Sequence, residues 1–105
     1  MKLLPYIVFA LTSCAVSALA AEMAITQKDQ TFSMASVNIG VGDKITFNNM
    51  DDVTHNISVR SADGDTEDLG LQKPGQKVVY KFPEAGTYRV ICSIHPKMKM
   101  TVVVK

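Results

Sequence analysis

One stretch of the chain decides the fold: residues 77–92, which read KVVYKFPEAGTYRVIC. Apolar side chains recur at every second position of this stretch: Val78, Tyr80 and Phe82, then Tyr88, Val90 and Cys92. A period of two residues is typical of β-strands that bury one face. Between the two runs, residues 83–86 contain a proline and a glycine, which mark a turn. The stretch therefore predicts two strands joined by a turn.

The same period continues elsewhere in the chain. Such runs cover residues 44–49, 55–60 and 99–105, with weaker ones at 23–27 and 32–39. In the first of them, Ile45, Phe47 and Asn49 alternate with their neighbours. The acidic segment 63–68 interrupts the pattern and is expected to be a solvated loop. Because no helical period is present, the sequence predicts an all-β antiparallel sandwich of seven to eight short strands.

The composition fits one folded domain. The chain has 105 residues, of which 47% are hydrophobic and 20% are charged. Eleven Lys and Arg residues against ten Asp and Glu residues give a net charge of +1. This charge supplies no field for binding nucleic acid or an anionic membrane. Abundant apolar residues also argue against disorder, so we expect a single globular domain that binds no nucleic acid.

The first twenty residues resemble a secretory signal peptide. Lys2 is the only charge before Glu22, and residues 3–18 are almost wholly apolar. Ala18-Leu-Ala20 then supplies the small residues that precede a cleavage site. The sequence thus predicts a signal peptide over residues 1–20, followed by a mature domain over residues 21–105 that is exported to a bacterial periplasm.

Two other interpretations concern the same segment. Leu11-Thr-Ser-Cys14 resembles a lipobox, which would make Cys14 a lipid anchor, although the apolar run before it is short. An uncleaved membrane helix fits less well because Pro5 interrupts the apolar run, so no stable membrane insertion is expected. Cleavage after Ala20 would leave Cys92 as the only cysteine. The mature domain would then lack an internal disulfide, so Cys92 requires another explanation.

The candidate functional residues are all metal-ligand types. Cys92, His95 and Met98 form a C-x2-H-x2-M motif, and His55 lies upstream at the start of a predicted strand. Two imidazoles, one thiolate and a weak axial thioether suit copper in both oxidation states. Zinc sites seldom use a thioether. The sequence therefore predicts one copper ion at this constellation.

The residues resemble the blue copper proteins, or cupredoxins, and particularly the small bacterial branch that includes amicyanin and pseudoazurin. The motifs that carry the resemblance are Val41-Gly-Asp-Lys-Ile-Thr-Phe-Asn-Asn49, His55-Asn56, Pro83-Glu-Ala-Gly-Thr-Tyr88 and Cys92-Ser-Ile-His95-Pro-Lys-Met98. The family implies a Greek-key sandwich, a mononuclear type 1 copper site and one-electron transfer between redox proteins. It also implies that His55, Cys92 and His95 are strong ligands and that Met98 is the weak axial ligand. Asn49 matches a position that ties the His55 loop to the Cys92 segment.

A second methionine competes for the axial position. His95 to Met100 has the longer spacing found in plastocyanin, whereas His95 to Met98 has the shorter spacing. In the family the ligand methionine lies four residues before the first valine of the closing strand, and Met98 and Val102 reproduce that interval. We therefore assign Met98 as the ligand and expect Met100 to pack in the core.

The expected partner face surrounds His95, whose imidazole edge can reach the surface. Val53 and Pro96, with Met50, are expected to form a modest apolar patch, and Lys97 is expected at its rim. Lys97 replaces an apolar residue of amicyanin, so partner identity cannot be transferred from the family. We expect transient contacts with a redox donor and a redox acceptor, and a monomeric protein.

Three function classes remain. The resemblance favours an exported electron-transfer protein, not an enzyme. The alternative is a periplasmic copper carrier or storage protein that uses the additional methionines, but these lack an M-x-x-M repeat. A thiol enzyme built on Cys92 and His95 lacks an orienting residue.

Asp51 and Asp52, like the acidic segment 63–68, are expected to be solvated loop residues.

Overall fold

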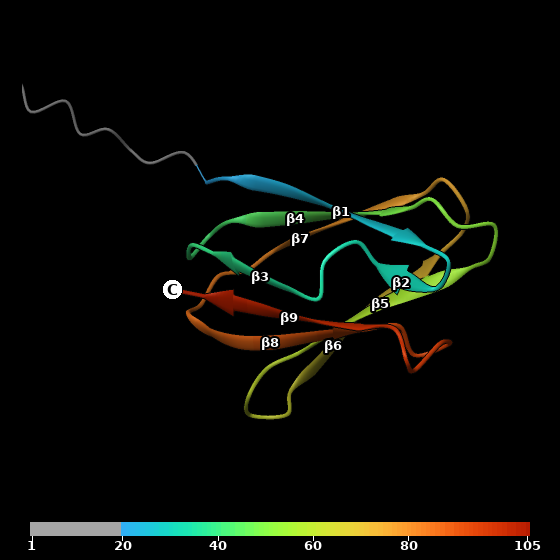
Figure 1. Ribbon diagram of the computed structural model, residues 1–105. Coiled ribbons are helices and arrows are strands. Elements are labelled where there is room, and N and C mark those ends of the chain that lie inside the picture. The colour runs from blue at the N-terminus through green and yellow to red at the C-terminus, as the bar shows by residue number, and fades with distance from the viewer. Residues whose placement is uncertain (1–19) are drawn as a thin grey trace, which may run out of the picture.

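Two β-sheets pack face to face in the computed structural model, which describes residues 20–105 and contains no helix in that range (Figure 1). The strands are β1 (Glu22–Lys28), β2 (Thr31–Phe32), β3 (Ser36–Ile39), β4 (Lys44–Asn49), β5 (His55–Arg60), β6 (Thr66–Gln72), β7 (Lys77–Lys81), β8 (Gly86–Ile91) and β9 (Lys99–Val104). One sheet has the order β2-β1-β4-β7, and the other has the order β3-β9-β8-β5-β6. The predicted all-β sandwich is confirmed.

The sandwich differs from the expectation in strand number and direction. It has nine strands in residues 20–105, and the pairs β1–β4 and β3–β9 are parallel, so both sheets are mixed. The remaining pairings are antiparallel. Alternating burial reveals which face of a strand is covered, but it carries no information on the direction of the neighbouring strand.

Two differences account for the strand number: the predicted run 32–39 divides into β2 and β3, and β6 was not predicted. Glu67 and Asp68 lie within it, whereas Asp63 and Asp65 lie in the loop before it, so the prediction that the whole acidic segment is a loop is wrong. Because β6 is an edge strand, most of its residues are exposed on both faces and no apolar alternation is needed. Gly70 adopts a φ of 93°, a left-handed conformation that disfavours other residues.

The core lies between the sheets and follows the predicted alternation. Ile45, Phe47 and Asn49 are buried on one face of β4, and Phe82 is fully buried just after β7. Tyr80 and Tyr88 pack edge-on against the Phe82 ring, with centroid separations of 4.8 and 5.2 Å. Burial of these rings stabilises the sandwich through apolar area and aromatic geometry.

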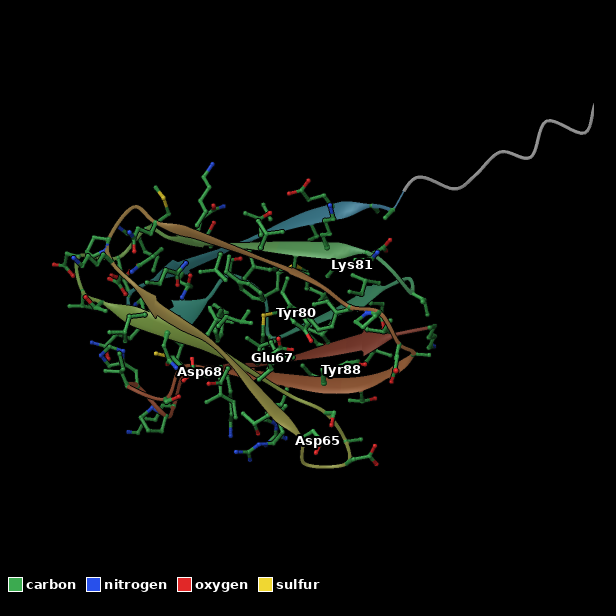
Figure 2. All side chains as sticks on the ribbon, turned by 180° about the vertical axis from the view of Figure 1, so that it is seen from behind. Asp65, Glu67, Asp68, Tyr80, Lys81 and Tyr88 are labelled. Carbon is green, nitrogen blue, oxygen red and sulfur yellow. The ribbon has the colours of Figure 1, made fainter. Side chains whose placement is uncertain are left out.

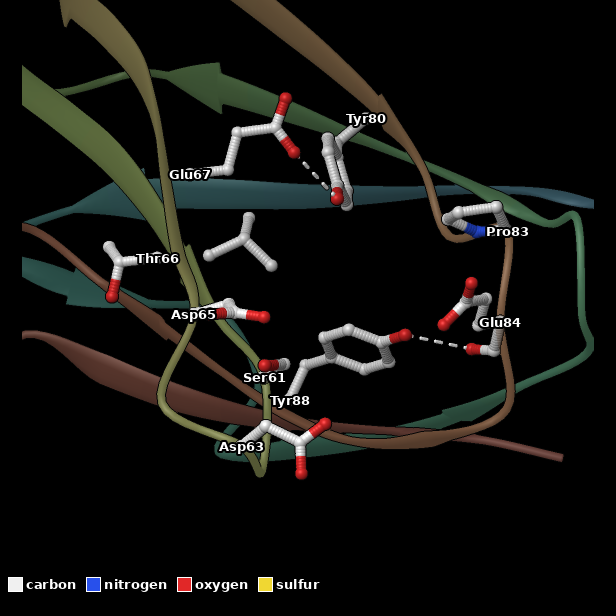
Figure 3. A pocket seen from close by; sticks show the side chains of 10 residues that line it. Ser61, Asp63, Asp65, Thr66, Glu67, Tyr80, Pro83, Glu84 and Tyr88 are labelled. Carbon is white, nitrogen blue, oxygen red and sulfur yellow. Dashed lines mark hydrogen bonds between the residues drawn. The ribbon is translucent and has the colours of Figure 1, made fainter.

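A hydrogen bond closes the seam between edge strands β6 and β7. The hydroxyl of Tyr80 donates to Glu67 Oε2 at 3.0 Å (Figure 3). Burial first, and then this hydrogen bond to Glu67, raise the pKa of Tyr80 to about 12. Figure 2 shows Glu67 and Tyr80 at the centre of this face, with Asp65 and Asp68 along the same edge. A hollow at this seam is lined by both tyrosines and four carboxylates: Asp63, Asp65, Glu67 and Glu84.

The loops that carry the predicted site meet at one end of the sandwich. The connections β1–β2, β4–β5, β6–β7 and β8–β9 lie at the end away from the C-terminus (Figure 1). Cys14 and all of the predicted signal peptide except Ala20 lie outside the described residues. Within the described part of the chain, the structure contains no helix that could span a membrane.

Candidate metal centre

Neighbouring strands bring the predicted ligands together. His55 is the first residue of β5, and Cys92 directly follows the last residue of β8. These strands pair in antiparallel register, with Ser58 opposite Ile91. The start of β5 therefore lies beside the end of β8. His95 and Met98 occupy the short loop from β8 to β9, so residues far apart in sequence converge at one end of the sheet.

Three donor atoms converge within a few ångströms. The Nδ1 atoms of His55 and His95 are 3.0 Å apart, and Cys92 Sγ lies 3.6 and 3.7 Å from them. His55 and Cys92 are fully buried, whereas His95 is half-buried. Two imidazole nitrogens and a thiol that face a common point form a donor set suited to copper. The predicted cluster of His55, Cys92 and His95 is thus present in the fold.

The two methionines occupy different environments. Met98 is almost fully buried but lies outside the main apolar cluster of the sandwich. Its backbone N–H donates to His95 O at 2.8 Å, and its carbonyl accepts from Cys92 N at 3.0 Å, which closes the loop beside the donor atoms. Met100 on β9 lies opposite Val90 on β8 and belongs to the apolar cluster. This separation supports Met98 as the axial ligand and Met100 as a core residue.

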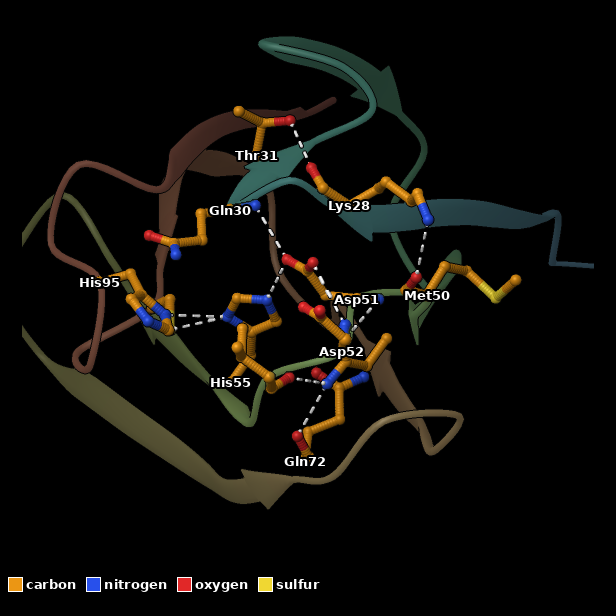
Figure 4. Close-up of polar contacts among 12 residues, drawn as sticks. Lys28, Gln30, Thr31, Met50, Asp51, Asp52, His55, Gln72 and His95 are labelled. Atoms are coloured by element: carbon orange, nitrogen blue, oxygen red, sulfur yellow. Dashed lines mark hydrogen bonds and ion pairs between the residues drawn. The ribbon is translucent and has the colours of Figure 1, made fainter.

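Asp51 contacts His55, which the sequence analysis did not anticipate. Its Oδ2 atom lies 2.9 Å from His55 Nε2 and accepts from the Gln30 N–H at 2.8 Å (Figure 4). The prediction that Asp51 is a solvated loop residue is therefore wrong. The hydrogen bond from Gln30 N–H first, and then the contact with the His55 ring, lower the pKa of the Asp51 carboxyl from 3.8 to about 2. A carboxylate on the far nitrogen fixes the ring orientation and directs Nδ1 toward the other donors. The sequence signal that could have indicated this contact was an acidic residue four positions before a predicted histidine ligand.

The turn that supplies the Gln30 N–H has an unusual backbone. Asp29 and Gln30 have φ values of 52° and 56°, although neither is glycine. Both residues are in the left-handed region, as a tight turn between antiparallel strands β1 and β2 requires. The hydrogen bond to Asp51 supports this turn. Through Asp51, the tip of the β1–β2 hairpin is linked to His55.

The roles of two asparagines differ from the expectation. The Asn49 amide nitrogen donates to Val53 O and Gln72 O, and its oxygen accepts from Asp51 N. Asn49 thus holds the loop before His55, but none of these contacts reaches the Cys92 segment. The prediction that Asn49 ties this loop to Cys92 is therefore wrong, because its strand position directs the amide toward β6.

Asn56 makes the connection that was expected of Asn49. Its backbone N–H donates to Cys92 Sγ at 3.4 Å. Its side-chain oxygen accepts from Ser93 N at 2.6 Å, and its amide donates to Ser93 Oγ at 2.9 Å. Asn56 follows His55 directly, so one residue links both sides of the site. Hydrogen bonding of this kind holds a thiolate in place.

The expected partner face is only partly assembled around one hollow. His95, Pro96 and Lys97 line it together with Gln30, Ile94 and Met98. Ile94 is 47% exposed and was not anticipated as an apolar member. Val53 is half-buried in the β4–β5 loop, and Met50 is 58% exposed; neither lines this hollow. The apolar surface next to His95 is therefore formed chiefly by the 92–98 loop itself.

Replacing Asp51 with asparagine is expected to destabilise the metal-free protein by about 1–2 kcal/mol at pH 7, because two hydrogen bonds to a charged acceptor are weakened. The folded-state pKa lies below the ordinary value, so the stabilisation is present above pH 3.8 and declines as the pH falls toward 2. Denaturant unfolding at pH 7, 4 and 2.5 measures this difference. Asp52→Asn is the matched control, since Asp52 is exposed. Equal behaviour of the two variants would contradict the role of Asp51.

Comparison with known proteins agrees with this geometry. A family model described as copper binding proteins of the plastocyanin/azurin family matches residues 19–105. Methylamine utilization protein MauL of Methylorubrum extorquens is 36% identical over 92 residues, or 88% of this chain and 81% of that protein. Amicyanin-alpha of the same organism is 34% identical over 76 residues, or 70% and 64% of the two chains. A solved structure of a reduced amicyanin variant aligns with a TM-score of 0.73 at 26% identity, over 80% of this chain and 82% of that one.

The family match and the donor geometry lead to one conclusion. The matched region includes the whole sandwich and the loops that carry the donor atoms. The converging nitrogen and sulfur atoms fit copper by their own chemistry. The chain belongs to the copper-binding plastocyanin/azurin family, and it is a copper protein with the cupredoxin fold.

Proposed function

We propose that this protein carries single electrons between redox proteins and has no catalytic activity. The observation that carries the proposal is an asymmetric site: His55 and Cys92 are fully buried, Met98 is almost fully buried, and His95 alone is half-buried. Copper held by these four side chains would supply a one-electron couple. One accessible imidazole edge shortens the path to a partner, while the other donor side chains are covered from solvent.

The residues around the site favour electron exchange because they limit rearrangement. Asp51 orients the His55 ring, and Asn56 donates to Cys92 Sγ while it binds Ser93. The hydrogen bonds between Met98 and the backbone of Cys92 and His95 close the loop. A donor set held by such contacts changes little in geometry when its charge changes. This rigidity supports a carrier of electrons.

We propose that partners dock around His95, Pro96 and Lys97, with Val53 contributing from the neighbouring loop. Pro96 and Lys97 are exposed, and they line one hollow with the His95 ring. Their apolar and cationic character suits a partner with an acidic rim. The contact is expected to be transient, and the carrier is expected to act as a monomer.

Lys97→Glu is expected to slow electron exchange with an acidic redox protein by about tenfold at 10 mM ionic strength, because steering by charge acts on the association rate. The deficit should shrink toward 0.5 M salt, where screening shortens the range of the charge to a few ångströms. Stopped-flow kinetics measures both rates. Lys105→Glu is the matched control at the C-terminus of the chain. A deficit that does not depend on salt would contradict steering by Lys97.

A copper carrier or storage protein is the second candidate function. Met34 and Met50 are 47% and 58% exposed and could contact Cu(I), but Met100 is packed in the core. Voltammetry of the copper-loaded protein distinguishes the two functions. An electron carrier gives a reversible one-electron wave through repeated cycles. Release of copper upon reduction would instead favour the carrier or storage function.

We also propose that the protein is exported to the periplasm and that its mature form begins at Ala21. The apolar segment before Ala20 and the small residues at its end support this proposal. Retention of that segment, or lipidation of Cys14, would place the same domain at a membrane surface.

A further inference from the structure

A row of four side chains crosses the outer face of the five-stranded sheet. Arg89 on β8 lies opposite Thr101 on β9, and it also lies opposite Arg60 on β5. Arg60 in turn lies opposite Thr66 on β6. The row is therefore Thr101, Arg89, Arg60, Thr66, and it crosses the adjacent strands β9, β8, β5 and β6 (Figure 1). Since neighbouring strands are about 4.8 Å apart, it spans roughly 14 Å.

The centre of this row places two positive charges side by side. Directly opposed like charges in an antiparallel pair destabilise the sheet. Both arginines are exposed, and the only hydrogen bond that either side chain makes in residues 20–105 runs from Arg60 Nε to Thr66 Oγ1 at 3.3 Å. Within that range no carboxylate oxygen lies within 4.0 Å of either guanidinium. The nearest acid by register, Asp68 in the next row, accepts from Gly70 N and from Asn56.

Two surface hollows flank Arg60. One is lined by both arginines and by the hydroxyl residues Ser61, Thr87 and Thr101. The other is lined by Arg60, Ser58, Thr66, Ile91, Ser93 and Pro96. Guanidinium groups present planar pairs of N–H donors, and hydroxyl groups add further donors around them. Such a surface matches carboxylate oxygens, which arginine binds in a bidentate manner.

The second hollow connects this surface to the metal centre. Ser93 follows Cys92, and Pro96 follows His95. Ser93 also hydrogen-bonds Asn56, whose N–H contacts Cys92 Sγ. A molecule seated on the arginine row and in this hollow would therefore lie against the 92–98 loop, on the outer face of the sheet.

We propose that this outer face is a docking surface for a carboxylate-rich protein surface of an electron-transfer partner. The inference rests on the proposed function and names the chemistry of its partner. The two adjacent guanidinium groups have no carboxylate partner in residues 20–105, so their charge complements a carboxylate-rich surface. The row is long enough for two carboxylates from one protein. A single inorganic phosphate would occupy only part of this row.

The test is a binding titration of the Cu(I)-loaded, ¹⁵N-labelled protein with a hexaglutamate peptide at low salt. Amide and arginine Nε–H signals of Arg60, Arg89 and their neighbours on β5 and β8 should shift. Arg60→Gln/Arg89→Gln should weaken the peptide affinity by about tenfold, as expected for the loss of two exposed ion pairs. Lys44→Gln/Lys81→Gln is the matched control, because these lysines are also cross-strand partners and the charge change is equal.

Parallel arms use inorganic phosphate and vesicles of phosphatidylglycerol. Three results would each overturn the proposal. They are shifts caused by phosphate but not by the peptide, binding to vesicles without binding to the peptide, and equal losses of peptide affinity in the Arg60/Arg89 and Lys44/Lys81 glutamine variants. Arg60→Lys/Arg89→Lys retains the charge but loses bidentate geometry, and an affinity between those of the parent and the glutamine variant is expected. Native-like dispersion of the amide signals confirms that each variant is folded.

The titration also separates this proposal from the proposed function. It uses one oxidation state and needs no electron exchange. A protein that binds hexaglutamate through the arginines but gives no reversible wave would contradict the proposed electron-transfer function and not the docking surface. A reversible wave without arginine-dependent peptide binding would contradict the docking surface alone.

Discussion

Replacing Cys92 with serine is expected to abolish the intense visible absorption of the oxidised, copper-loaded protein. A thiolate strongly coupled to Cu(II) gives the charge-transfer band, and a serine oxygen cannot replace it. Cys92 Sγ is fully buried and faces the Nδ1 atoms of both histidines at 3.6 and 3.7 Å, and Cys92 is the only thiol in residues 20–105. Titration with Cu(II) followed by a visible spectrum measures the effect, which should be nearly complete.

The control for this variant is Ile91→Val, which alters the preceding residue and preserves the donor set. Ile91 is half-buried and lies opposite Ser58 in the sheet. It should retain the absorption band and one copper per chain. A Cys92→Ser variant with the parental colour would remove Cys92 from the assigned site.

Met98→Leu is expected to raise the reduction potential, whereas Met100→Leu should leave it nearly unchanged. A thioether stabilises the more highly charged copper ion, so its loss favours the reduced state. If the preference changes tenfold or more, the shift is about 60 mV or more for one electron. Voltammetry at constant pH measures it. The two variants form a matched pair because both methionines are almost fully buried.

The stability of the same variants gives the second part of this test. Met100 packs in the apolar cluster opposite Val90, and a volume-conserving replacement there should cost less than about 1.5 kcal/mol. Denaturant unfolding of the metal-free proteins measures that cost. A large potential shift in Met100→Leu with none in Met98→Leu would assign the axial position to Met100 and the longer loop spacing to this chain.

The strands with one buried face could be predicted from sequence because their signal is local. Ile45 and Phe47 alternate with partly exposed residues along β4, and the burial pattern follows this alternation. Strand β6 could not be found in this way, since an edge strand contacts solvent along most of its length and its residues need no apolar period. The parallel pairs β1–β4 and β3–β9 were equally hidden, because each depends on a partner distant in sequence.

The chemical identity of the donor atoms could be predicted from the sequence by itself. Cys92, His95 and Met98 are close in the chain, so a short loop brings them together in any fold that turns there. His55 could be added because it begins a predicted strand. The chemistry of two imidazoles, one thiol and a thioether then indicated copper without any coordinates.

Only the tertiary structure decided which residues support that site. The contact between Asp51 and His55, the bridge from Asn56 to Cys92 and Ser93, and the row formed by Arg60 and Arg89 all depend on loop conformation or on strand register. A shift of one residue in a strand pairing would exchange inward and outward side chains and remove these contacts. Residue types and short spacings thus determined the metal chemistry, whereas strand pairing set its hydrogen bonds and the charges on its outer face.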